Sequence, residues 1–192
     1  MYQVRLHGRG GQGVVTAAEL LAAAAIADGS YAQAFPSFGS ERTGAPVAAY
    51  CRIDDKPIRN REPVADPDAV LVLDPSLLGQ LSLVDGLKPG ALVLINAPDT
   101  GTVARAIPGV RVYAVPATQI ARERTGRPLP NAAMIGAFAA VGVATLDSVR
   151  CAIKARFSGA VAEANVQAAT DAHDYLLRGA GIAPVDEEAR SA

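Results

Sequence analysis

The stretch that decides the fold is residues 2–28, YQVRLHGRGGQGVVTAAELLAAAAIAD. Residues 2–7 predict a strand, and residues 14–28 predict a long helix that stops before Gly29. The glycine loop between them, residues 8–13, follows the strand at once and opens the helix. A loop in this position presents bare backbone N–H groups at the positive end of a helix, where they can bind an anion such as a phosphate.

Further short apolar runs alternate with helical patterns along the rest of the chain. Asp74, followed by a proline, predicts a helix cap at the end of one apolar run, and Asn131 and Asp147 predict caps for two later helices. The expected strands cover residues 31–35, 47–53, 69–73, 91–95 and 110–115, and the expected helices cover 118–124, 132–144, 147–157 and 158–178. Together they predict an α/β fold: a Rossmann-like open, mostly parallel sheet with flanking helices and a helical C-terminal third. We expect a single domain over residues 1–182 and a polar tail over 183–192.

Composition excludes several classes of protein. Half of the 192 residues are hydrophobic and the net charge is −1, which argues against a nucleic-acid binder. No apolar run is long enough for a membrane span, and the first residues lack the pattern of a signal peptide. The two cysteines, Cys51 and Cys151, form no CxxC pair; we expect them to be small core residues in a cytoplasmic protein. They are too few to hold an iron–sulfur cluster alone.

The first helix carries a single charge, Glu19, between Val14 and Ala27. A helix that is apolar nearly all round must be covered on most sides. The sequence leaves two ways to cover it open: a partner protein, or a second layer of this domain.

The glycine loop also matches the GxGxxG spacing of dinucleotide-binding folds through Gly8, Gly10 and Gly13. Those folds place a carboxylate at the end of the second strand, but here that strand ends in Ala34-Phe35-Pro36. The sequence therefore disfavours a dinucleotide site. A tight turn without a ligand is the other alternative, although four glycines in six residues favour close approach by a ligand or another chain.

Three longer segments resemble one known family. They are residues 7–21, which contain the glycine loop, residues 31–47 (YAQAFPSFGSERTGAPV) and residues 72–78 (VLDPSLL), and the later stretches 126–128 (GRP) and 131–136 (NAAMIG) fit the same pattern. In this order they resemble the gamma subunit of the 2-oxoacid:acceptor oxidoreductases, the pyruvate:ferredoxin oxidoreductase family. The resemblance covers residues 2–175, nearly the whole chain. One departure is Thr43, where the family pattern often has a second arginine after Arg42.

The resemblance implies a multisubunit enzyme that oxidatively decarboxylates a 2-oxoacid to an acyl-CoA. It implies alpha, beta and delta-type partner subunits, with thiamine diphosphate, magnesium and 4Fe-4S clusters on those chains and no cofactor bound by this chain alone. Ferredoxin is the implied electron acceptor, or NAD through a flavoprotein subunit. Coenzyme A enters as a substrate. In fused members of the family, the domain that corresponds to this chain is associated with binding coenzyme A. A purely structural assembly subunit remains an alternative.

The expected site residues lie in two loops and contact coenzyme A; we expect no catalytic residue and no metal ligand on this chain. They are Gly8, Arg9, Gly10, Gly11, Gln12, Gly13, Ser40, Arg42, Thr43 and Gly44. Arg9 and Arg42 are the best anion contacts because a guanidinium fits a phosphate in a bidentate fork, with a solvated or intersubunit ion pair as the alternative. His7 and His173 are expected to be packed, structural residues, and Asp74 a helix cap.

Overall fold

The computed structural model describes residues 1–37, 44–79, 83, 85–98 and 110–180. The strands are β1 (Tyr2–Arg9), β2 (Tyr31–Pro36), β3 (Pro46–Asp54), β4 (Ala69–Val72), β5 (Leu92–Asn96) and β6 (Arg111–Val115). The helices are α1 (Val14–Ala27), the short 3-10 helix η1 (Pro75–Leu77), α3 (Ala117–Thr125), α4 (Asn131–Ala139), α5 (Leu146–Arg156) and α6 (Gly159–Ala180). These elements confirm the α/β prediction, including the helical C-terminal third. The predicted tail, residues 183–192, lies outside the described residues.

The strands form one mixed sheet in the order β2-β3-β1-β4-β5-β6. The pairs β1-β4, β4-β5 and β5-β6 are parallel, whereas β3 runs antiparallel to both β1 and β2. The connection from β2 to β3 spans only residues 37–45, which is too short for the crossover that a parallel pair needs. The sheet is therefore mostly parallel, with an antiparallel hairpin at one edge.

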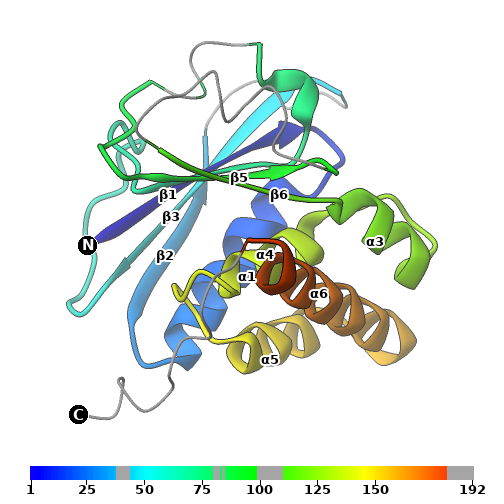
Figure 1. Ribbon diagram of the computed structural model, residues 1–192. Coiled ribbons are helices and arrows are strands. Elements are labelled where there is room, and N and C mark those ends of the chain that lie inside the picture. Colours follow the sequence, from blue (N-terminus) through cyan, green and yellow to red (C-terminus); the bar gives the residue numbers. More distant parts are fainter. Residues whose placement is uncertain (38–43, 80–82, 84, 99–109, 181–192) are drawn as a thin grey trace.

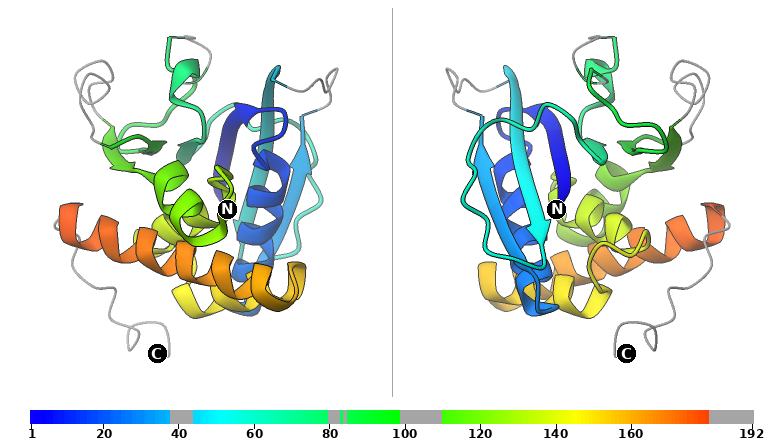
Figure 2. Two further views of the ribbon diagram at one scale, coloured as in Figure 1. Left: turned by 90° about the vertical axis from the view of Figure 1, so that its right-hand side faces the viewer. Right: turned by 90° about the vertical axis from the view of Figure 1, so that its left-hand side faces the viewer.

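The α-helices gather on one face of the sheet, as Figures 1 and 2 show. Alternate residues of the central strands, such as Leu71 and Leu94, point into the large core between the sheet and these helices. Val70, Val72, Val93 and Ile95 point to the opposite face, where a smaller apolar cluster includes Leu78 and Leu87 instead of a helix layer. This arrangement explains why the central strands are apolar throughout: both of their faces are covered.

Helix α1 lies between the sheet and the other helices. It packs against β1, β2 and β3 on one side and against α4 and α5 on the other. Its buried residues include Val14, Leu20 and Leu21, while Glu19 and Ile26 are exposed. The sequence left open whether a partner protein or a second layer of this domain covers the helix. In the structure, a second layer of the same domain covers it.

On the face of the sheet that lacks helices, two buried arginines bind the segment between β3 and β4, and Arg5 also binds the segment between η1 and β5. Arg5 is 7% exposed and Arg52 is 2% exposed. Burial lowers the pKa of both guanidinium groups, but both remain the charged donors that backbone carbonyls need. The acceptors are the carbonyl oxygens of Val64, Leu83 and Asp85 for Arg5, and of Asn60 and Glu62 for Arg52.

Three local predictions were wrong. Helix α5 is capped by Thr145, whose side chain accepts from the Ser148 N–H, and Asp147 lies in the first turn of the helix. Asn131 is the first residue of α4 and follows Pro130 at the cap position. Its carboxamide oxygen accepts from the next N–H instead, at 2.8 Å. Cys51 is buried as expected, but Cys151 is exposed because it lies on the outer side of α5.

Asp28 joins the end of α1 to the start of α5. Its carboxylate accepts hydrogen bonds from the Thr145 N–H at 2.7 Å, the Thr145 hydroxyl at 2.7 Å and the Ser148 hydroxyl at 2.6 Å. Hydrogen bonds to a charged group are stronger than neutral ones, and their loss leaves donors unsatisfied.

We therefore expect Asp28→Ala to lower the free energy of unfolding by about 2 kcal/mol. Urea denaturation of the purified chain measures the effect. Asp55→Ala is the control, because Asp55 is an exposed aspartate outside helices and strands. Equal stability of the two variants would show that the Asp28 contacts contribute nothing.

No helix among the described residues is long and apolar enough to cross a membrane.

Candidate functional site

The glycine loop connects the carboxyl end of β1 to α1, as the sequence predicts. Gly13 occupies the N-cap position of α1 in a left-handed conformation (φ 75°), and no side chain caps the helix. Two backbone hydrogen bonds join the loop to the start of β3: Gly10 N–H donates to the Ala45 carbonyl at 2.9 Å, and Gly44 N–H donates to the Gly10 carbonyl at 3.1 Å. The structure thus brings Gly44 beside the loop, as the candidate site requires.

Internal packing accounts for two of the four glycines. A β-carbon on Gly8 would lie 2.6 Å from Val14 Cγ2, and one on Gly13 would lie 2.5 Å from Asn131 Nδ2. Close approach within the domain therefore requires glycine at these two positions. Gly11 differs, because it has a φ of 94° but open space around it. Among these three, a ligand or partner from outside can use only the space beside Gly11.

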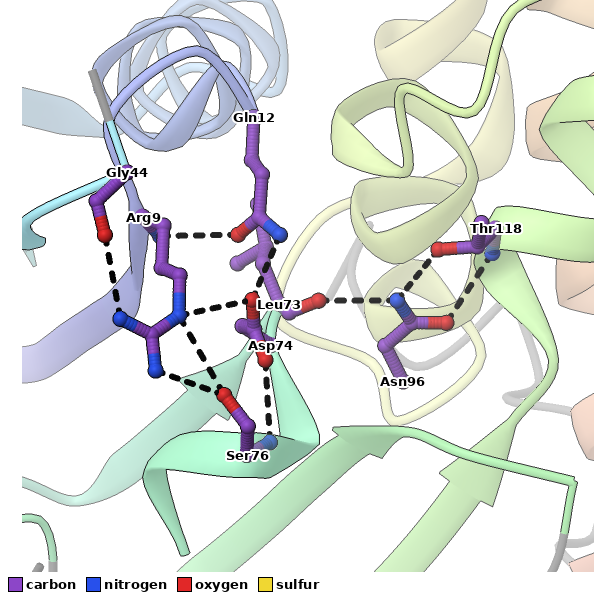
Figure 3. A network of polar contacts seen from close by, with 8 residues as sticks. All are labelled: Arg9, Gln12, Gly44, Leu73, Asp74, Ser76, Asn96 and Thr118. Atoms are coloured by element: carbon purple, nitrogen blue, oxygen red, sulfur yellow. Dashed lines mark hydrogen bonds and ion pairs between the residues drawn. The ribbon is translucent and has the colours of Figure 1, made fainter.

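A polar network fixes Arg9 at the edge of the loop (Figure 3). Its guanidinium donates to the Gly44 carbonyl from Nη1 at 3.0 Å and to the Ser76 hydroxyl from Nη2 at 2.8 Å. Its Nε lies 3.3 Å from the Asp74 carboxylate, and about a third of the side chain is exposed. Arg9 therefore already forms an ion pair within this chain, and its outer edge still faces solvent.

Gln12 and Asp74 complete this network. Gln12 accepts from the Arg9 N–H at 2.8 Å and donates to Asp74 Oδ2 at 2.8 Å. Asp74 also accepts from the Ser76 N–H at 2.9 Å, which confirms its predicted role as a cap. Burial raises the pKa of the Asp74 carboxyl, but the hydrogen bonds from Ser76 and Gln12 and the charge of Arg9 outweigh it and leave the pKa below its usual value. Asp74 thus stays ionised and holds the loop to the end of β4.

Asn96 is a residue of this region that sequence reasoning missed. It ends β5, is 7% exposed, and donates from Nδ2 to the Leu73 carbonyl at 2.8 Å and to the Thr118 hydroxyl at 2.6 Å. Its carboxamide oxygen accepts from the Thr118 N–H at 3.0 Å (Figure 3). Asn96 therefore joins β4, β5 and α3. The available signal was a polar residue directly after a fully apolar strand, because strand ends at this edge of a parallel sheet converge.

His7 immediately precedes the loop. Its side chain is partly buried, and its Nε2 has no hydrogen-bond partner among the described residues. Burial, together with the charge of Arg5, lowers the pKa of the imidazole to about 4. His7 is therefore packed, as expected, and neutral near pH 7. His173 lies on α6, with its Nδ1 3.1 Å from Asp174.

Three expected site residues, Ser40, Arg42 and Thr43, lie outside the described residues. No group of three or more His, Cys, Asp or Glu side chains that could hold a metal ion occurs in the described ranges. Burial raises the pKa of the Cys51 thiol to about 12, so this cysteine is not a thiolate near pH 7.

The sheet order also bears on the dinucleotide alternative. In a dinucleotide-binding fold, the strand after the first helix returns parallel to the first strand, in the same half of the sheet. Here β2 lies at the edge, separated from β1 by the antiparallel β3. Among the described residues, the chain therefore lacks two features of a dinucleotide-binding fold: a carboxylate at the end of β2 and a parallel strand next to β1 on the side where β3 lies.

Comparison with known proteins shows the family. The family model for pyruvate ferredoxin/flavodoxin oxidoreductase matches residues 3–175. The chain belongs to this family. Curated relatives include the pyruvate/ketoisovalerate oxidoreductases common subunit gamma of Thermococcus kodakarensis, 50% identical over 92% of this chain and 98% of that protein. The pyruvate synthase subunit PorC of Methanothermobacter marburgensis is 48% identical, with the same coverage. The chain is therefore a gamma-type subunit of this family, as its motifs predict.

Solved structures give the same result. The pyruvate oxidoreductase subunit PORC of Thermotoga maritima is 36% identical, with a TM-score of 0.79 over 90% of this chain and 95% of that one. The gamma subunit of a keto/oxoacid ferredoxin oxidoreductase from Geobacter sulfurreducens is 28% identical, with a TM-score of 0.75 over 93% of this chain and all of that one. A 2-oxoglutarate:ferredoxin oxidoreductase from Magnetococcus marinus shares the fold, with a TM-score of 0.76 at 20% identity, over 97% of this chain and 32% of that one.

Proposed function

We propose that this gamma-type chain helps to bind coenzyme A and to assemble an enzyme that converts a 2-oxoacid to an acyl-CoA. In this proposal alpha, beta and delta-type subunits carry thiamine diphosphate, magnesium and 4Fe-4S clusters, and the complex works in the cytoplasm. Thiamine diphosphate supplies the decarboxylation chemistry on its own subunit. Ferredoxin is the proposed electron acceptor, with NAD through a flavoprotein subunit as the alternative. Family membership supports the subunit role, and the glycine loop supports the coenzyme A role.

The observation that carries the coenzyme A proposal is the uncapped start of α1 beside the open Gly11. Gly13 is the N-cap, no side chain forms a capping hydrogen bond there, and space is open around Gly11. Backbone N–H groups at a helix start favour an anion, and the carboxyl edge of a parallel sheet is where α/β folds bind ligands. Phosphate groups of coenzyme A have the matching charge.

Arg9 gives this place a positive side chain that is already oriented. The contacts of its guanidinium with Gly44, Ser76 and Asp74 fix the group before any ligand arrives. A preoriented arginine loses less conformational freedom on binding than a free one. Asp74 works in the opposite direction, since its charge competes with a phosphate for the same guanidinium.

The test is Arg9→Ala in the enzyme assembled with its native partner subunits. We expect KM for coenzyme A to rise about tenfold, because one charged hydrogen bond contributes about 1.5 kcal/mol. Use of the 2-oxoacid should change little, since decarboxylation precedes transfer of the acyl group. Arg42→Ala, in the second loop, should act in the same way. Steady-state kinetics with each substrate varied in turn measures both constants.

Arg122→Ala is the matched control, because Arg122 is an exposed arginine on α3. Size-exclusion chromatography verifies that each complex is intact. If KM for coenzyme A stays unchanged in both loop variants while the complex remains assembled, the chain is an assembly subunit without a role in coenzyme A binding.

A further inference from the structure

A cavity of about 530 Å³ lies on the helical side of the molecule, and none of its lining residues belongs to the polar network of Arg9. It is lined by the end of α3, the segment that leads into α4, and the first turns of α6. Leu129, Phe157 and Val161 form its apolar wall. Val161 is 58% exposed, which is unusual for a large apolar side chain in the described part of this chain. The wall therefore continues onto the outer surface of the protein.

Two buried asparagines, Asn131 and Asn165, line the cavity. Asn131 is 6% exposed and Asn165 is 8% exposed. The oxygen of Asn131 accepts from the Ala132 N–H, and the nitrogen of Asn165 donates to the Val161 carbonyl at 2.8 Å. Asn131 Nδ2 packs against the glycine loop, where a β-carbon on Gly13 would lie 2.5 Å from it. Among the described residues, Asn165 Oδ1 has no hydrogen-bond partner, so the cavity offers one carbonyl acceptor.

Arginines supply the charge around this opening. Arg127 lines the cavity, is exposed, and its guanidinium has no partner among the described residues. Arg124 also lines it and pairs with Asp171 through Nε. Arg156 lies outside the lining, and its guanidinium stacks 5.5 Å from the centre of the Phe157 ring. The opening is therefore net positive.

We propose that this cavity binds an extended peptide segment of a partner subunit that carries an acidic group next to an apolar side chain. A peptide backbone has the N–H group that can donate to the carboxamide oxygen of Asn165. The apolar side chain would cover Leu129, Phe157 and Val161, and the acidic group would pair with Arg127. The inference rests on the proposed role in assembly, but not on the proposed binding of coenzyme A. Aromatic and arginine side chains are the residues that most often dominate such interfaces.

The experiment uses the enzyme assembled with its native partner subunits. We expect Arg127→Glu and Val161→Gln each to weaken association of this subunit at least tenfold, measured by mass photometry over a dilution series. Matched controls are Arg122→Glu, an exposed arginine on α3 outside the cavity, and Ile26→Gln, a 55% exposed apolar residue on α1. Both controls should assemble like the unaltered protein.

A photo-crosslinking residue at position 161 identifies the occupant. Mass spectrometry should find a partner-subunit peptide with an aspartate, glutamate or terminal carboxylate within a few residues of an apolar side chain. Unchanged association of Arg127→Glu and Val161→Gln would overturn the proposal. So would a tenfold rise in KM for coenzyme A in these variants with assembly intact, because the cavity would then belong to a small anionic ligand. If Arg9→Ala does not change KM for coenzyme A, the outcome of this association test is unaffected.

Discussion

Replacing Gly136 with alanine is expected to lower the free energy of unfolding by about 3 kcal/mol. Gly136 lies in α4 where this helix crosses α6. A β-carbon there would lie 2.1 Å from the Ala169 carbonyl oxygen and 2.5 Å from its carbonyl carbon. Because these are backbone atoms, no side-chain rotation relieves the overlap, and the two helices must move apart. Urea denaturation followed by circular dichroism measures the change.

Gly179→Ala is the matched control in a helix. Gly179 belongs to α6, and a β-carbon there would meet nothing within 4 Å. Alanine favours a helix more than glycine does, so this variant should be as stable as the unaltered chain or more stable by up to about 1 kcal/mol. If Gly136→Ala lowers the free energy of unfolding while Gly179→Ala raises it, the close contact between α4 and α6 is established. A loss of less than 1 kcal/mol at Gly136 would show that the two helices do not pack so closely.

The second large effect is a loss of stability in mild acid caused by His7. Burial lowers the pKa of this imidazole to about 4 in the folded chain, from 6.5 for an ordinary histidine. Well above pH 6.5 the imidazole is neutral in both states, so its contribution to stability does not change there. Between pH 6.5 and 4 the unfolded chain binds the proton more readily, and stability falls as pH falls. The full difference is about 3 kcal/mol, of which roughly 2 kcal/mol is lost by pH 5.

His7→Gln should remove this fall in the free energy of unfolding between pH 6.5 and 5, while His173→Gln should leave the fall unchanged. The measurement is the free energy of unfolding in urea at half-unit steps of pH. A curve for His7→Gln that runs parallel to that of the unaltered chain over this range would show that His7 is accessible to protons in the folded state. Carboxylates dominate below pH 5, so the comparison is made above it.

Local sequence signals determined most of the elements. The glycine loop between residues 2–7 and 14–28 predicts β1 and α1 because hydrophobic periodicity and glycine chemistry act over a few residues. Asp74 is a cap, as its position before a proline predicts. Thr145, not Asp147, caps α5, because both residues have a side-chain oxygen that can accept the hydrogen bond at the start of that helix.

The sequence motifs also determined the family, since they occur in a fixed order along nearly the whole chain. Only the tertiary structure decided why Gly8 and Gly13 are glycines, because the side chains of Val14 and Asn131 that they approach belong to other elements. It also decided that Arg9 is fixed by Asp74 and Ser76, some 65 residues further along the chain. The physical reason is the same in each case. Propensity and capping depend on neighbours in sequence, whereas close packing and charge pairing depend on which strand ends the sheet order brings together.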